Sequence, residues 1–229
     1  MRVLLTNDDG IHAPGLQALE EAVRQLGWQS VVVAPAFEQS QCGHRVTTHQ
    51  PLKVEAQGEN RHAVHGTPAD CVRLALFALD ARPDLVLSGI NAGGNMGQDI
   101  VISGTVAAAR EAAYHGVRSL SLSHYLIRDL HVDWSRASTW IAEILRETLV
   151  QEQPQRAFWN INLPHLPPGA DPLPPRILCR PAHSPLNVAY TSNEHGYAYS
   201  ASYASRPRDP GSDVEACFSG NVAVSLLHV

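Results

Sequence analysis

Two adjacent carboxylates, Asp8 and Asp9, follow a short apolar run near the start of the chain. Carboxylates this close repel each other, and a hard divalent cation is the usual way to relieve that repulsion. The flanking Asn7 and Gly10 are residues that favour turns, so the same stretch also fits a simple polar turn. By itself the pair leaves both interpretations open, a metal site or a turn.

Three further polar clusters also lie at the ends of apolar runs: Ser40, the segment from Asn91 to Asn95, and the segment from Ser103 to Thr105. If the runs are parallel strands, their carboxyl ends lie on one side of a sheet, where residues far apart in sequence can converge. Their oxygen donors favour Mg²⁺, Mn²⁺ or Ca²⁺ over zinc. Ser40 taken singly is an ordinary loop serine, and only the clusters together indicate a site.

An anion seat is predicted beside these oxygen donors. Ser103 is placed as the N-cap of an alanine-rich helix that Gly116 ends, and the free N–H groups of such a helix start attract phosphate. Gly93, Gly94 and Gly97 would let backbone approach the anion closely. A divalent metal beside a phosphate seat suggests metal-assisted hydrolysis of a phosphate ester.

The elements that must position these residues alternate between strand and helix, which predicts a parallel α/β sheet. Short antiparallel strands are expected within 45–65, and Thr67, Pro68 and Asp70 form a helix start. The expected strands are 3–5, 30–34, 84–89, 119–123 and 158–163, and the expected helices are 16–26, 68–81, 103–116 and 134–150.

The composition changes at Pro164, where closely spaced prolines exclude a helix and suggest a linker. Beyond it, 176–180, 197–204 and 221–229 have the character of strands separated by polar loops. We therefore expect an α/β body over 1–163. Residues 164–229 should form a linker and an antiparallel β appendage with a role in oligomerisation, packed on the same domain.

Bulk properties exclude several classes of function. The 229 residues are 44% hydrophobic with a formal net charge of −5, which disfavours binding to nucleic-acid polymers or anionic membranes. The sequence has no apolar stretch of membrane-spanning length, and it opens with a strand pattern rather than a signal peptide. Its four scattered cysteines indicate reduced thiols in a cytoplasmic protein, without disulfides or zinc.

Five colinear motifs closely resemble the SurE family of metal-dependent survival-protein nucleotidases: 6–15, 33–40, 66–71, 88–93 and 103–109. The resemblance implies a Rossmann-like three-layer body with an extended or swapped β appendage, assembled as homodimers or homotetramers. It also implies hydrolysis of nucleoside 5′- and 3′-monophosphates and, in some members, of exopolyphosphate.

The resemblance further assigns the site residues and one divalent ion per subunit, Mg²⁺ or Mn²⁺, with Ca²⁺ as another occupant. The metal ligands by motif position are Asp8, Asp9, Ser40 and Asn91. The phosphate seat comprises Asn95, Ser103, Gly104 and Thr105, with Gly43 and His44 nearby. Asp8 and Asp9 are then the catalytic carboxylates, and Asp9 is the candidate general base.

The sequence departs from the family pattern at two places close to the site. Ala36-Phe37 stands where the family usually has an aspartate, and Arg45 adds a positive charge where a serine is usual. A non-catalytic nucleotide- or metal-binding regulatory module on the same fold remains an alternative function. A dinucleotide-dependent oxidoreductase is disfavoured, because Asp8-Asp9-Gly10 occupies the turn where a G-x-G-x-x-G fingerprint belongs.

Overall fold

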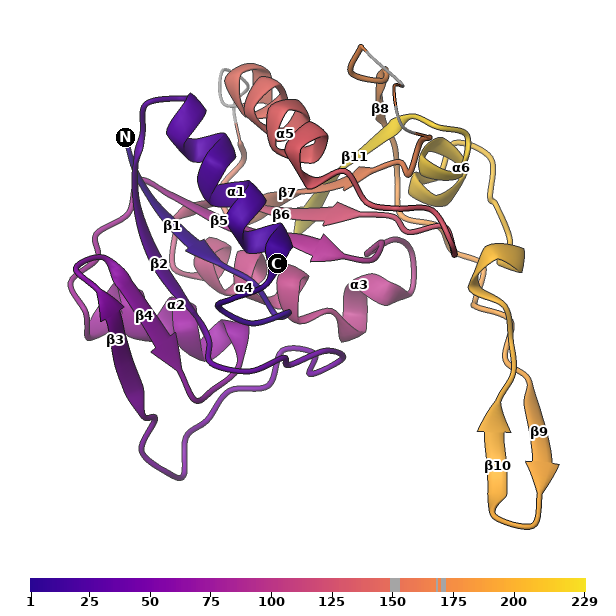
Figure 1. The fold of residues 1–229 in the computed structure, drawn as a ribbon, viewed down its shortest axis with the longest axis horizontal. Helices are drawn as coiled ribbons and strands as arrows, with labels where there is room; N and C mark the ends of the chain where they lie inside the picture. The colour runs from indigo at the N-terminus through magenta and orange to yellow at the C-terminus, as the bar shows by residue number, and fades with distance from the viewer. Residues whose placement is uncertain (149–152, 168, 170–171) are drawn as a thin grey trace.

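A computed structural model describes residues 1–148, 153–167, 169 and 172–229. Its centre is a nine-stranded sheet (Figure 1). In sheet order the strands are β3 (Val54–Gly58), β4 (Arg61–Val64), β2 (Gln29–Pro35), β1 (Arg2–Thr6), β5 (Leu85–Ala92), β6 (Arg118–His124), β7 (Ala157–Leu163), β11 (Val222–His228) and β8 (Arg176–Leu178). The six strands that run in this order from β4 to β7 are mutually parallel. The antiparallel pairings, β3 with β4 and β11 with β7, lie toward the sheet edges.

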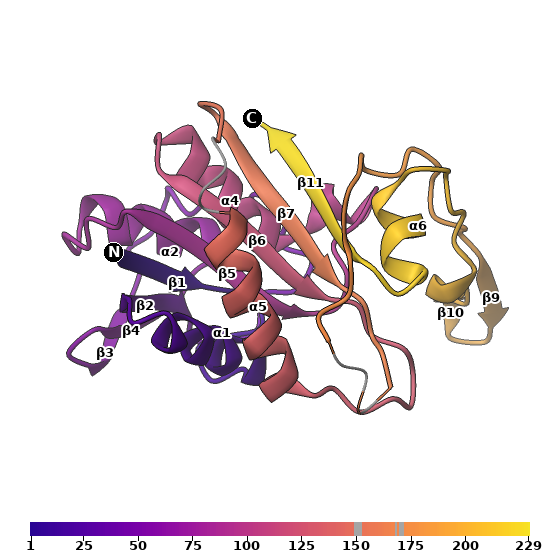
Figure 2. The same ribbon diagram turned by 90° about the horizontal axis from the view of Figure 1, so that it is seen from above.

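Helices cover both faces of this sheet and complete a three-layer α/β fold (Figure 2). On one face pack α1 (Pro14–Gln25) and α5 (Trp134–Thr148), and on the other pack α2 (Pro68–Phe77) and α4 (Gly104–Tyr114). Successive residues of a strand point to opposite faces. In β1, Val3 and Leu5 accordingly join the core under α1 and α5, whereas Leu4 joins the core under α2 and α4.

Local signals for the helix starts are confirmed. The Thr67 side chain accepts from the Asp70 backbone N–H while the Asp70 carboxylate accepts from that of Thr67, so α2 opens with a reciprocal capping box. Ser103 caps α4 by accepting from the Val106 N–H at 3.1 Å. The expected extension of α2 to residue 81 is wrong, because the helix ends at Phe77 and Asp80 takes a left-handed φ of 49°.

The sequence-based limits of the main sheet also need correction. Residues 158–163 were expected to be its last strand, but β11 pairs antiparallel with β7 and β8 pairs parallel with β11. The local pattern identified these strands, but their long-range pairing places them in the main sheet. Two short helices, α3 (Asp99–Ile102) and α6 (Asp213–Phe218), were not expected. The end of the helix expected over 134–150 lies outside the described residues.

Within the described residues, the only strands separate from the main sheet are β9 (Tyr190–Asn193) and β10 (Gly196–Tyr199). They form an antiparallel hairpin that projects away from the α/β body, and we call this hairpin the arm (Figure 1). None of the described helices has the length and apolar character needed to cross a membrane. The four cysteines are free thiols.

Candidate active site

Asp8 and Asp9 lie in the turn directly after β1. The Asn7 side chain shapes this turn by donating to the Gly10 carbonyl at 2.9 Å, and Gly10 has a φ of 102° that side-chain-bearing residues rarely adopt. Asp8 is 5% exposed, whereas Asp9 is half-buried. The turn interpretation and the site interpretation are therefore compatible, because the turn aims both carboxylates to one side of the sheet.

Two neighbouring loops are hydrogen-bonded to this turn. The Gln39 N–H donates to the Asp8 carbonyl at 2.7 Å, which places Ser40 beside the carboxylates. At the end of β5 the Ala92 N–H donates to Asp9 Oδ2 at 3.1 Å, and the Asn91 amide donates to the Gly93 carbonyl at 2.8 Å. The three strand ends are thus joined at one edge of the sheet.

These loops surround a cavity of about 630 Å³, which we call the catalytic cavity. Seven of the residues singled out from sequence line it: Asp8, Asp9, Ser40, Asn91, Gly94, Asn95 and Ser103. The polar residues at the ends of the parallel strands therefore converge as expected, and the separate roles of these residues stay predictions.

The start of α4 packs tightly behind Asp8. A Cβ on Gly104 would lie 2.9 Å from both the Asp8 Cβ and the Cys42 Sγ, so only glycine fits there. The Thr105 side chain is fully buried, and its hydroxyl donates to Asp8 Oδ1. Thr105 was expected to offer this hydroxyl to a phosphate, whereas in the structure the hydroxyl supports the carboxylate.

Asn95 is held by a set of polar side chains that sequence reasoning missed. Its N–H donates to Asn162 Oδ1 at 2.8 Å, and its carbonyl accepts from the side chains of Asn160 and Asn162. Its own amide donates to Ser123 at 2.9 Å. Two asparagines at alternate positions of an otherwise apolar strand were the available signal, because side chains two residues apart share a face.

Gly43 and His44 lie next to the site but are not among the residues that line the catalytic cavity. The Gly43 N–H donates to the Ile102 carbonyl at 2.9 Å. The His44 ring contacts Glu111 on α4, with Nε2 2.6 Å from Oε2. A contact of His44 Nε2 with phosphate would require this nitrogen to leave the carboxylate.

The catalytic cavity is acidic and has little compensation from the protein. Burial raises the pKa of Asp8 to about 6, with the Thr105 hydrogen bond opposing this shift and the neighbouring Asp9 charge adding to it. Burial also raises the pKa of Asp9, against the Ala92 hydrogen bond. The third acid, Asp99, pairs with Arg206 at 2.6 Å. In the described part of the chain, no lysine, arginine or histidine lines this cavity.

The donor set fits a hard divalent cation. Among the described residues, no three His, Cys, Asp or Glu side chains cluster in a way that would hold a metal. The cavity instead combines two carboxylates with a hydroxyl and an amide, which are the oxygen donors that Mg²⁺ and Mn²⁺ prefer. A cation here would neutralise the two carboxylates that lack a positively charged partner.

Fold and site together define a three-layer α/β protein with its acidic site at the carboxyl edge of the parallel strands, where open α/β sheets bind ligands. The family model described as "Survival protein SurE" matches residues 3–177. The chain belongs to the SurE family, as the motifs suggested.

Relatives match along the full chain. A Synechocystis sp. protein, named as a provisional 5′-nucleotidase, is 49% identical over 229 residues and both chains are fully covered. The 5′-nucleotidase SurE of Erythrobacter litoralis is 41% identical, covering 100% of this chain and 94% of the relative. The crystal structure of the SurE protein from Aquifex aeolicus superposes with a TM-score of 0.86 at 33% identity, covering 100% of this chain and 93% of that one.

Proposed function

We propose that this protein is a divalent-metal-dependent phosphomonoesterase that hydrolyses nucleoside 5′-monophosphates, and 3′-monophosphates as well, to nucleoside and phosphate. One observation carries the proposal: among the described residues, the buried Asp8 and the half-buried Asp9 have no cationic partner, and Asp8 lies directly against the start of an eleven-residue helix. An anionic substrate would be repelled by this pair unless a cation were bound. The names of the relatives, 5′-nucleotidase SurE, support the substrate class.

Asp8, Asp9, Ser40 and Asn91 would hold the cation. When bound, the cation supplies Lewis-acid polarisation of a phosphoryl oxygen and lowers the pKa of a bound water. Thr105 orients Asp8 through its hydroxyl, and the turn after β1 fixes the spacing of the two carboxylates. Asp9 is the less buried of the two, which makes it the candidate to accept the proton of the attacking water.

The phosphate would lie between Asn95 and the start of α4. The first N–H groups of a helix have no acceptor within the helix and carry partial positive charge. Asn95 borders the same space and is fixed by Asn160, Asn162 and Ser123 before any ligand binds. Such preorganised donors hold the transferring group without rearrangement during the reaction. Gly43 and His44 stay predicted as nearby substrate contacts.

The arm is proposed to assemble homodimers or homotetramers. Every residue of β9 and β10 is exposed, and Tyr190, Tyr197 and Tyr199 are among the exposed large side chains. Exposed aromatic side chains on a projecting hairpin are typical of protein interfaces. Sedimentation of the full chain beside a chain with 190–199 replaced by a short glycine linker would measure this contribution.

The test of function is phosphate release from a panel of nucleoside monophosphates with Mg²⁺, Mn²⁺ or EDTA. Metal-dependent release that EDTA abolishes is the expected result, and polyphosphate in the same panel measures the further activity that the family resemblance implies. Folded protein that binds nucleotide and metal but releases no phosphate would contradict the enzyme and favour the regulatory binding module.

A further inference from the structure

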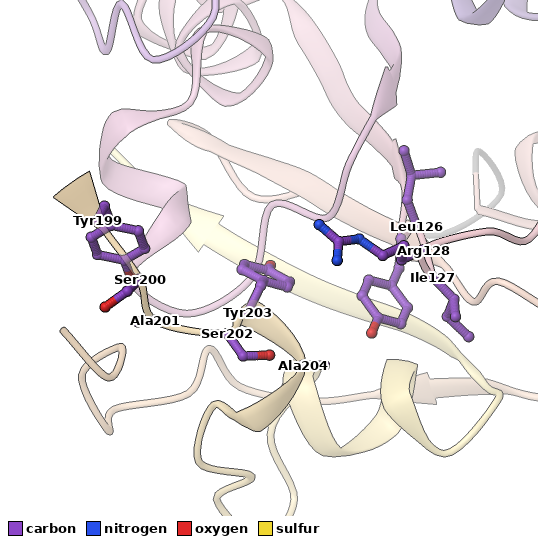
Figure 3. Close-up of a pocket in the computed structure, with 10 residues that line it drawn as sticks. Leu126, Ile127, Arg128, Tyr199, Ser200, Ala201, Ser202, Tyr203 and Ala204 are labelled. Carbon is purple, nitrogen blue, oxygen red and sulfur yellow. The ribbon is translucent and has the colours of Figure 1, made fainter. Parts of the chain in front are cut away.

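A second cavity of about 620 Å³ has ten lining residues, which Figure 3 shows, and shares two of them with the catalytic cavity. It lies between residues 125–128, which follow β6, and residues 199–204 at the base of the arm, and we call it the arm cavity. Tyr199 and Tyr203 line both cavities, so the two spaces lie on either side of the same two side chains. Its volume falls in the range of about 300–1,000 Å³ that is usual for small-molecule sites.

The lining of the arm cavity suits a planar, uncharged group that carries hydroxyls. Tyr125 and Tyr203 contribute aromatic rings with centroids 6.3 Å apart, and Ser200 and Ser202 contribute hydroxyl groups. The side chain of Arg128 points toward Tyr203 in the view of Figure 3. It is the single charge among the ten lining residues, all of them described, and none of the ten is acidic.

Tyr203 is fixed in place before any ligand arrives. Its hydroxyl donates to Asp99 Oδ2 at 2.7 Å and accepts from Arg206 at 2.7 Å. The Arg206 guanidinium also lies over the ring, 4.8 Å from its centroid, and is almost fully buried. A ring held this way loses little conformational entropy when a flat ligand stacks on it.

We propose that the arm cavity is the nucleoside subsite, with Tyr203 as the platform on which the base stacks. This inference rests on the proposed phosphomonoesterase function. In a nucleoside monophosphate, one ester oxygen joins the phosphate to the nucleoside, so the nucleoside must occupy a space next to the phosphate seat. Tyr203 meets this requirement because its hydroxyl also lies 3.4 Å from the carbonyl of Gly94, the residue before Asn95.

A matched pair of variants isolates the aromatic face. Tyr203→Phe and Tyr203→Leu both lose the hydroxyl bond to Asp99, and only Tyr203→Leu loses the ring. We expect the KM for AMP to be about 10-fold higher in Tyr203→Leu than in Tyr203→Phe, which is the size of effect that base stacking on an aromatic side chain gives. For glycerol phosphate, an ester without a base, the two variants should have the same KM. The subsite would be overturned if the ratio of the two variants' KM values were the same for both esters, or if the two variants had the same KM for AMP.

Binding of adenosine and AMP, measured by calorimetry, separates this inference from the proposed function because it requires no turnover. Tyr203→Phe keeps the ring and should bind both ligands about 10-fold more tightly than Tyr203→Leu. If such binding is found in a protein that releases no phosphate, the subsite proposal is supported and the proposed phosphomonoesterase function is contradicted. If phosphate is released but the binding of both ligands is absent or insensitive to Tyr203→Leu, the subsite is refuted and the phosphomonoesterase holds.

Discussion

Two buried acidic centres lie along α4, and they differ in how the protein compensates their charge. At the start of the helix, Asp8 and Asp9 receive neutral hydrogen bonds from Thr105 and Ala92. Near its end, Glu111 is 2% exposed and contacts three basic side chains, those of Arg73, His44 and His115, at 2.6, 2.6 and 2.9 Å.

The two centres shift their carboxyl pKa values in opposite directions. Burial alone would raise the pKa of Glu111, but the three hydrogen bonds from His44, Arg73 and His115 outweigh it and lower the pKa to about 2. At Asp8 burial prevails and the pKa rises to about 6. The protein therefore supplies countercharge where a carboxylate serves the structure. It omits countercharge at the site where we propose an external cation.

The largest effect is expected from Asp8→Asn, which keeps the shape of the side chain and removes its charge. Metal-dependent phosphate release should fall about 1,000-fold, because metal stabilisation of a phosphoryl transition state is worth several kcal/mol. The melting temperature in EDTA should stay the same or rise, since an uncompensated buried charge is removed. Unchanged turnover would show that Asp8 is not a ligand.

The pH dependence of stability should have opposite signs at the two centres in EDTA. The pKa of Asp8 is raised, so this group favours the folded state most below about pH 4. That contribution to the free energy of unfolding, on the order of 3 kcal/mol, is lost as the pH rises through about 6. The pKa of Glu111 is lowered, so its contribution is present above about pH 4.5 and is lost as pH falls toward 2.

Urea unfolding across this pH range measures how the free energy of unfolding changes with pH. The change between about pH 4 and 6 belongs to the Asp8 centre, and the change between about pH 4.5 and 2 belongs to the Glu111 centre. Asp8→Asn should reduce the first to the part that the raised pKa of Asp9 contributes and leave the second unchanged, and Glu111→Gln should remove only the second. If one variant removes both changes, the two centres are coupled and the comparison between them fails.

Glu111→Gln should destabilise the protein by about 2 kcal/mol, because it leaves the basic cluster without its buried carboxylate. The figure is below that of a fully buried pair, since Arg73 is 43% exposed and screened by water. Metal affinity should be unchanged. Glu21→Gln on α1 removes an exposed pair with Arg24 and serves as the control, with no measurable change. Loss of metal binding in Glu111→Gln would contradict the division of roles.

Thr105→Val should have the smallest effect, about a 10-fold rise in the metal concentration required for half-maximal activity. It removes a hydrogen bond to the charged Asp8, and such bonds are worth about 1.5 kcal/mol. The KM for the phosphate ester at saturating metal should change little. A raised KM with unchanged metal dependence would instead indicate that the Thr105 hydroxyl contacts the phosphate, as the sequence predicts.

The sequence alone determined the features that depend on neighbouring residues. Local chemistry specifies the buried strand over 3–5, the helix start at Thr67 and Asp70, and the serine cap of α4. The convergence of Asp8, Ser40 and Asn91 also followed, because the rule that parallel strand ends share an edge applies whatever lies between the strands.

Tertiary structure decided the features that depend on partners distant in sequence. Asn160 and Asn162 acquire a role only because β7 lies beside the loop that carries Asn95. In the same way, the Thr105 hydroxyl donates to Asp8, which is 97 residues away in sequence. Strand β11 joins the main sheet through β7 although its own residues fit an appendage equally well. Local propensity specifies that a segment is a strand, whereas the buried surface and hydrogen bonds of the whole fold select the strand with which it pairs.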